Sequence, residues 1–174
     1  MKIIILGANQ VGRALAETLA IEANDITVID TDVAKLAELK DRIDVGTVTG
    51  HACHPDVLER AGGQDADMLI AVTDSDEINM VACRVAYTLF QTPKKICRLQ
   101  STSYLSADKL FGKKGIAVDV VISPELIVSD YISRLLDIPG SLQVLDFADG
   151  KAQLVAVKAY FGGPLVGQEI RLLR

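Results

Sequence analysis

The sequence has no tryptophan, and aromatic residues make up only 5% of its 174 positions. Single-strand nucleic-acid binding by base stacking needs aromatic platforms, so this sequence offers little support for it. Basic residues are also outnumbered, because 18 lysines and arginines face 23 acidic residues and the net charge is −5. Nucleic-acid backbones and anionic membranes attract basic faces, so this balance argues against a general nucleic-acid binder and against docking on lipid.

Long hydrophobic runs and paired-cysteine motifs are missing as well. No apolar stretch approaches the roughly 20 residues of a membrane-spanning helix, and the blocks that exist are short, as in Ile3–Leu6. The first apolar segment is too short for a signal-peptide core. Cys53, Cys83 and Cys97 form an odd set without C-x-x-C spacing. We interpret them as reduced, apolar side chains of a cytosolic protein.

What is present is an alternation of short β-rich runs with helical stretches. The expected strands are Lys2–Leu6, Asp25–Ile29, Val45–Thr49, Met68–Val72, Ile96–Leu99 and Val118–Ile122, and the expected helices are Val11–Glu22, Asp32–Asp41, Pro55–Ala61, Glu77–Phe90 and Tyr104–Phe111. Alternation of this kind is typical of βαβ units and a parallel sheet. Because the strands read as continuous apolar runs, helices should cover both sheet faces. The sequence therefore predicts an α/β fold with a Rossmann-like, doubly wound parallel sheet.

Three parts are expected along the chain. Residues 1–122 would form the Rossmann-like domain, and residues 123–140 a linking helix that starts at Ser123-Pro124-Glu125 and stops at Pro139-Gly140. The apolar positions of this helix span more than one stripe, which favours packing against a neighbouring subunit. Residues 141–174 read as a β-hairpin followed by the incomplete start of a C-terminal subdomain.

The sharpest motif is the run Gly7-Ala8-Asn9-Gln10-Val11-Gly12, which follows the first strand and opens a helix. A dinucleotide-binding fingerprint requires this context. Its first glycine permits a tight turn and its last lets helix and strand pack closely, while Asn9 replaces the middle glycine and crowds a phosphate more than glycine does. A tight turn without a ligand is the alternative. Walker A hydrolysis is excluded, because Arg13-Ala14 occupies the positions of its lysine and hydroxyl residue.

An acid follows at the expected distance. Asp30 ends the second strand, close to the offset of about 20 residues from the glycine loop. A carboxylate there accepts both hydroxyls of an adenosine ribose and repels a 2′-phosphate, and no arginine follows within Thr31-Asp32-Val33. This pattern favours NAD(H), ATP or ADP over NADP. The alternative role of Asp30 is to cap the next helix.

Three further strand ends supply candidates for the same crevice. His51, in Gly50-His51-Ala52, could pack on the adenine, and Thr73 and Asp74 could line the pyrophosphate or the second ribose. Arg98 lies in the fifth strand, where an arginine needs either a phosphate or an aspartate partner.

Signals for metal binding or catalysis are thin. His51, Cys53 and His54 are close in sequence but lack zinc-site spacing, and loop histidines are the alternative. No tyrosine is followed four residues later by lysine, and hydride transfer needs an acid or base at the nicotinamide. We therefore expect a nucleotide that is bound and not used, with no catalytic residue and no metal. An NAD-dependent oxidoreductase, or its cofactor-binding fragment, is the alternative.

Taken together, these motifs resemble the KTN/RCK domains of potassium transport, over essentially the whole chain. The resemblance is carried by Lys2–Gly12, Asp30 after Val28-Ile29, Gly50-His51-Ala52 followed by Pro55–Leu58, the stretch Thr73–Asn79, and Gly163–Gly167. It implies binding of NAD(H), or of ATP/ADP at the same site, without catalysis. It also implies homodimers or rings beneath a membrane-embedded potassium transporter subunit, at the cytoplasmic face of the membrane, with ligand exchange gating K⁺ flux.

The resemblance also implies a set of site residues and two details of this chain. The cofactor-binding set would be Gly7, Ala8, Asn9, Gln10, Val11, Asp30, Thr73, Asp74 and Arg98, with His51 as a further member. His51 stands where many relatives have an aspartate. An acid resembling Glu125 meets a cation or nucleotide near the dimer interface in related ring proteins, and the alternative is a partner for the helix dipole. Gly163–Gly167 would begin the C-terminal subdomain.

Overall fold

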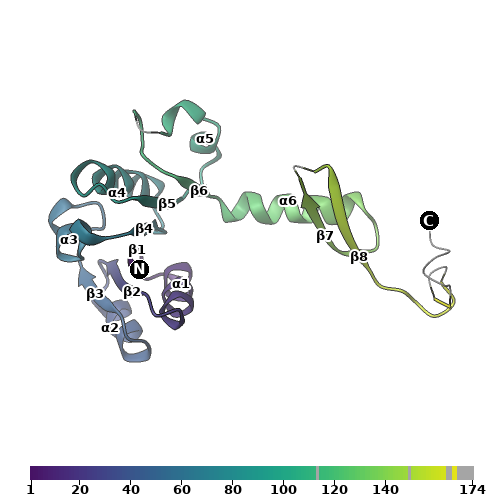
Figure 1. Ribbon diagram of the computed structural model, residues 1–174, viewed down its shortest axis with the longest axis horizontal. Coiled ribbons are helices and arrows are strands. Elements are labelled where there is room, and N and C mark those ends of the chain that lie inside the picture. Colours follow the sequence, from purple (N-terminus) through teal and green to yellow (C-terminus); the bar gives the residue numbers. More distant parts are fainter. Residues whose placement is uncertain (113, 149, 164–165, 168–174) are drawn as a thin grey trace. The chain divides into compact units, whose positions relative to one another are not determined.

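The computed structural model describes residues 1–112, 114–148, 150–163 and 166–167. Its first unit, residues 1–123, is built on a six-stranded parallel sheet (Figure 1). The strands are β1 (Lys2–Leu6), β2 (Asp25–Asp30), β3 (Gly46–Thr49), β4 (Met68–Ala71), β5 (Lys94–Arg98) and β6 (Val120–Ile122). Their order, β3-β2-β1-β4-β5-β6, reverses between β1 and β4. This is the dinucleotide-binding order, so the predicted Rossmann-like sheet is confirmed.

Helices connect the strands of this unit. They are α1 (Gln10–Ile21), α2 (Val33–Arg42), α3 (Pro55–Arg60), α4 (Asp76–Leu89) and α5 (Thr102–Leu105), with 3₁₀ turns at Gly63–Asp65 and Asp108–Leu110. Asn9, Asp32 and Ser75 each accept a backbone N–H bond at the start of α1, α2 and α4. Such side chains satisfy donors that a helix leaves open at its first turn.

The core lies on both faces of the sheet. Ile3 and Ile5 of β1 pack with residues of α1 and α2, whereas Ile4 and Leu6 pack with residues of α3 and α4. Successive side chains of a strand point to opposite faces, so an uninterrupted apolar run such as Ile3–Leu6 is buried on both sides. The expectation that helices cover both faces is therefore confirmed.

Most predicted bounds shift by one or two residues in the structure, and one predicted helix has a different form. The predicted helix Tyr104–Phe111 is instead the short helix α5 and a 3₁₀ turn, since Ser- and Thr-rich segments compete with helical hydrogen bonding. Strand β5 begins at Lys94 and not at Ile96. Lys95 is buried within it, because its amine forms an ion pair with Asp119 at 2.8 Å and donates to the carbonyl of Thr92 at 2.9 Å.

The second unit, residues 124–174, contains α6 (Pro124–Asp137) and an antiparallel hairpin of β7 (Ser141–Phe147) and β8 (Ala152–Val157). The hairpin is the predicted one. Pro164, Leu165 and residues 168–174 lie outside the described residues, and with them most of the expected start of a C-terminal subdomain. The limits 1–122, 123–140 and 141–174 stay a prediction. Within the described ranges, no helix has both the length and the apolar character needed to cross a bilayer.

Candidate nucleotide site

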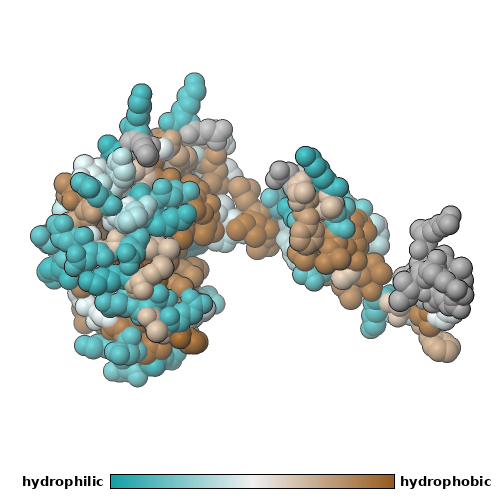
Figure 2. Space-filling view, viewed as in Figure 1, coloured by the Kyte–Doolittle hydropathy of each residue, from teal (hydrophilic) through white to brown (hydrophobic). Residues whose placement is uncertain are grey.

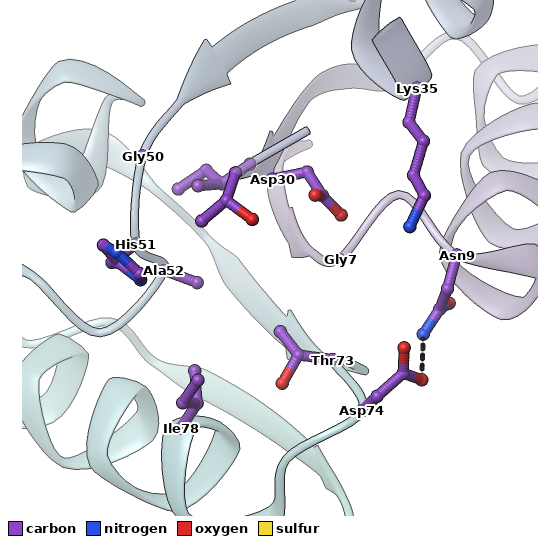
Figure 3. Close-up of a pocket in the computed structure, with 12 residues that line it drawn as sticks. Gly7, Asn9, Asp30, Lys35, Gly50, His51, Ala52, Thr73, Asp74 and Ile78 are labelled. Carbon is purple, nitrogen blue, oxygen red and sulfur yellow. Dashed lines mark hydrogen bonds between the residues drawn. The ribbon is translucent and has the colours of Figure 1, made fainter. Parts of the chain in front are cut away.

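A pocket opens at the carboxyl ends of β1, β2, β3 and β4, where the strand order reverses (Figure 3). In open α/β sheets, ligands bind in the crevice at this switch point. The pocket is lined by Gly7, Asn9, Ile29, Asp30, Thr31, Lys35, Gly50, His51, Ala52, Thr73, Asp74 and Ile78.

The glycine loop passes close to its neighbours at two positions, tightly at Gly7 and without room for a side chain at Gly12. Gly7 has φ +103°, and a Cβ there would lie 3.1 Å from Thr73 Cα. A Cβ on Gly12 would lie 1.8 Å from the carbonyl oxygen of Gly7. The first glycine therefore makes the turn and the last permits close packing of α1 on β1, as the motif predicts.

Asn9 stands at the middle position without needing a glycine conformation, because its φ is −74° and its ψ −178°. Its Oδ1 accepts from the Gly12 N–H at 3.0 Å and so caps α1. Its Nδ2 donates to the carbonyl of Val72 at 2.8 Å and to Asp74 Oδ1 at 2.9 Å. The side chain is thus turned toward the end of β4 and joins the two loops that border the pocket.

Asp30 holds the glycine loop from the end of β2. Its Oδ2 accepts from the Ala8 N–H at 2.6 Å, and its Oδ1 accepts from the Asp32 N–H at 2.8 Å. The side chain that caps α2 is Asp32, which accepts from the N–H groups of Ala34 and Lys35. The alternative that Asp30 caps this helix is therefore wrong, and its carboxylate faces the pocket.

A buried asparagine fixes the loop after β4. Asn79 is fully buried on α4, and its Oδ1 accepts from the Thr73 N–H at 3.0 Å and from the Thr73 hydroxyl at 2.7 Å. Its Nδ2 donates to the carbonyls of Thr73 at 3.1 Å and Arg98 at 3.0 Å. Asn79 therefore ties the ends of β4 and β5 together and orients Thr73 toward the pocket. It could have been predicted from its position on the apolar face of α4.

Arg98 reaches the site through an acid. Its Nη1 lies 3.7 Å from Asp74 Oδ1, so the aspartate partner considered for it is present. Arg98 does not line the pocket, and neither do Ala8, Gln10 and Val11, which belong to the loop and the first turn of α1. The pocket does bring together Gly7, Asn9, Asp30, His51, Thr73 and Asp74. Ligand binding by any of these residues stays a prediction.

The histidines lie at one side of the pocket. The rings of His51 and His54 are 5.2 Å apart and tilted by 42°, and only His51 is among the lining residues. Over the described part of the chain, no group of three or more histidine, cysteine, aspartate or glutamate side chains is arranged to hold a metal ion.

Beside the pocket, Glu77 has a lowered pKa, because its backbone N–H, the Ser75 hydroxyl and the Tyr104 hydroxyl hydrogen-bond to the ionised carboxylate. The same contact raises the pKa of Tyr104. Glu77, in the first turn of α4, therefore adds a negative charge next to the β4–α4 loop.

Comparison with known proteins agrees with this geometry. The profile of the TrkA-N domain family matches residues 3–124. The chain is 60% identical, over its whole length, to the Trk system potassium uptake protein TrkA of Halomonas elongata, of which it spans 38%. In fold it is similar to the TrkA-N domain of the inner membrane protein ybaL of Escherichia coli, with TM-score 0.67, 19% identity, and coverage of 79% of this chain and 96% of that one. It is also similar to the GsuK channel bound to NAD, with TM-score 0.65, 20% identity, and coverage of 85% of this chain and 25% of that one.

Proposed function

The chain belongs to the TrkA-N domain family, and on that premise we propose that it is a nucleotide-sensing regulatory domain of a potassium uptake system. It would gate the transporter through a ligand-dependent change of conformation, without catalysing a reaction. The observation that carries this proposal is the pocket at the switch point of the sheet, bordered by the glycine loop, Asp30 and Thr73.

The ligand we propose is NAD(H), with ATP or ADP as alternatives at the same site. The Asp30 carboxylate would accept the hydroxyls of the adenosine ribose, and the loop from Gly7 to Val11 would hold the pyrophosphate at the start of α1, where the helix dipole favours anions. His51 would pack near the adenine. Support for NAD comes from the fold shared with the NAD-bound GsuK channel.

Gating requires that the ligand bind one conformation more tightly than another. The variable half of the ligand, the nicotinamide or the γ-phosphate, would extend toward Thr73, Asp74 and Arg98. Asp74 already contacts both Asn9 of the glycine loop and Arg98 of β5, so a ligand that competes for these side chains would change how the two loops are joined. The helix α6 would carry the change to a neighbouring subunit.

The second unit supports an assembly. No residue of α6 is buried, and hydrophobic side chains gather over α6 and the hairpin (Figure 2). The exposed ones include Leu126, Ile127, Val128, Tyr131, Ile132, Leu136, Leu142, Phe147 and Leu154. Exposed apolar patches of this kind mark interaction surfaces. We propose that α6 packs against another copy in a homodimer or ring, with Glu125 in its first turn near that interface.

The remaining partner would be the membrane-embedded subunit of the potassium transporter, which would hold the assembly at the cytoplasmic face of the membrane. This part of the proposal rests on the similarity to the Trk system protein of Halomonas elongata, of which the chain spans 38%.

Calorimetric titration of the chain with NADH, NAD⁺, ATP, ADP and NADPH tests the proposal. We expect saturable binding of NAD(H) or of adenine nucleotides, weaker binding of NADPH, and no change in the absorbance of bound NADH over time. If none of the five ligands binds, the result would contradict a nucleotide sensor. The domain would then be an oligomerisation scaffold with a Rossmann-like fold. Oxidation of bound NADH on adding a candidate substrate would instead support the alternative, an NAD-dependent oxidoreductase or its cofactor-binding fragment.

A further inference from the structure

Lys35 is a cation of the pocket that the sequence motifs do not include. We propose that its amine binds a phosphate group of the nucleotide and makes the pocket selective for phosphorylated nucleosides over free nucleosides. This inference rests on the proposed nucleotide site and adds to it the residue that recognises the phosphate.

The start of α2 sets the position of Lys35. Asp32 caps this helix and accepts from the Lys35 N–H at 3.3 Å, which places Lys35 in its first turn. The half-buried side chain lines the pocket together with Gly7 and Asp30. Figure 3 shows it running from α2 toward the glycine loop, with the amine pointing into the space between Asp30 and Asn9.

The acids near Lys35 are occupied by other partners. Glu38, one turn further along α2, forms ion pairs with Arg13 at 2.7 Å and with Arg42 at 3.1 Å. Asp30 accepts two backbone N–H bonds, and Asp32 is the helix cap. Within the described ranges, Lys35 has neither an ion pair nor a side-chain hydrogen bond.

The other charged residues that line the pocket are acidic, so a cation would help the pocket to bind a phosphate. Among the described residues that line it, Lys35 is the one lysine or arginine, whereas Asp30 and Asp74 are both acidic. A phosphate that entered without Lys35 would meet two carboxylates, and like charges disfavour one another. The compact ammonium of lysine suits phosphate as a point charge, and its hydrogen bonds to an anion are charge-assisted.

Phosphate chemistry could come from two positions of an adenine nucleotide. The amine faces the glycine loop, where a 5′-phosphate would lie, and it is also close to Asp30, where a 2′-phosphate would lie. The recognised group is a phosphate monoester or diester in either case, and titration with 5′-AMP and with 2′-AMP separates the two positions.

The test is titration of the 174-residue chain and three variants with adenosine, 5′-AMP, 2′-AMP and ADP. Lys35→Gln removes the charge, Lys35→Arg keeps it, and Lys40→Gln is a matched control, because Lys40 is an exposed lysine on the same helix outside the pocket. We expect Lys35→Gln to weaken 5′-AMP and ADP about ten-fold, as for loss of one charge-assisted hydrogen bond, and to leave adenosine unchanged. Lys35→Arg should retain most of the affinity for phosphate, and Lys40→Gln should match the unaltered chain.

Salt dependence provides a second readout, which a purely structural role of Lys35 would not alter. The affinity for 5′-AMP should fall with ionic strength in the unaltered chain and fall less steeply in Lys35→Gln. A loss confined to 2′-AMP would overturn the inference, because NAD(H), ATP and ADP carry no 2′-phosphate and Lys35 would then leave their phosphates untouched. Equal loss for adenosine and 5′-AMP, or no loss at all, would overturn it while leaving the proposed function intact. Absence of all binding by the unaltered chain would overturn both.

Discussion

Asn9 and Asp74 connect the two loops that border the pocket, through a hydrogen bond of 2.9 Å from Nδ2 to Oδ1. The same oxygen of Asp74 faces Arg98 Nη1 at 3.7 Å. One carboxylate therefore contacts the loop after β1 and a side chain of β5. Because the Asp74 side chain is 77% exposed while that of Arg98 is 14% exposed, Asp74 is the member of this group that a ligand reaches first.

Asp74→Asn tests what this carboxylate does. The variant keeps an oxygen that can accept from Asn9 but removes one negative charge from a pocket that would hold phosphates. We expect ADP and ATP to bind about three-fold more tightly, since the exposed charge is largely screened by water and salt. NADH should gain less, because Asp74 would no longer accept as strongly from its second ribose. Calorimetry at low and high salt measures both effects, and uniform weakening of all three ligands would contradict this account.

Asp30→Asn tests the ribose contact. An amide has one accepting oxygen, so it cannot keep the bonds to the Ala8 and Asp32 N–H groups and also accept both ribose hydroxyls. Affinity for adenine nucleotides should therefore fall about ten- to a hundred-fold. The variant also removes the repulsion of a 2′-phosphate, so the preference for NADH over NADPH should narrow.

The matched control for Asp30→Asn is Asp32→Asn. It makes the same change of charge two residues away and outside the pocket, and asparagine caps helices as well as aspartate does. Calorimetry should find its nucleotide affinity close to that of the unaltered chain. Equal losses in the two variants would point to general electrostatics or to disturbance of α2 instead of ribose binding.

The sequence was most informative where backbone geometry dictates the residue. Gly7 and Gly12 were predicted because a tight turn and a close helix-strand contact exclude other side chains, and the structure bears out both reasons. Asp30 was predicted at the correct strand end, although its bond to the Ala8 N–H depends on how β1 and β2 pair.

Other features could not be predicted because they depend on tertiary contacts between distant segments. The sequence pattern of α2 predicts that Lys35 is a surface residue of an amphipathic helix. Its place in the pocket depends on how α2 packs on the sheet. Lys95 stands next to Lys94, before the apolar residues of β5, and its burial depends on Asp119, 24 positions away. Spacing along the chain carries no information about such partners.

The Lys95–Asp119 pair gives a stability prediction. The Lys95 side chain is 4% exposed and that of Asp119 is 39% exposed, with 2.8 Å between Nζ and Oδ2. Asp119→Asn should lower the free energy of unfolding by about 2 kcal/mol, because it leaves a buried ammonium with backbone carbonyls as its remaining hydrogen-bond partners. Urea denaturation measures the loss. The control is Asp65→Asn, which breaks the exposed pair with Lys2 and should cost less than about 0.5 kcal/mol.

The same pair sets a pH dependence. Burial alone would raise the pKa of Asp119, but hydrogen bonds and the charge of Lys95 outweigh it and lower the pKa below the ordinary 3.8. A carboxyl with a depressed pKa stabilises the folded state above its unfolded pKa, and this contribution is lost as pH falls through the folded value. The difference in unfolding free energy between the unaltered chain and Asp119→Asn should be constant from about pH 5 to 8 and shrink below about pH 4. A difference that grew on acidification would contradict this assignment.

Gly12→Ala sets two opposed effects against each other. Alanine favours a helix over glycine by about 1 kcal/mol, so propensity alone predicts that α1 is stabilised. The added Cβ would lie 1.8 Å from the backbone oxygen of Gly7, however, and no side-chain rotation relieves that contact. We expect the clash to prevail, with a loss of about 3 kcal/mol in urea denaturation and loss of ADP binding as the loop is displaced. Gly62→Ala is the control, because Gly62 has φ +87° but open space around its Cβ, so only backbone strain of about 1 kcal/mol should appear, with ADP affinity retained. A Gly12→Ala variant as stable as the unaltered chain would show that α1 can move away from β1, and the glycine would then serve the ligand instead of the packing.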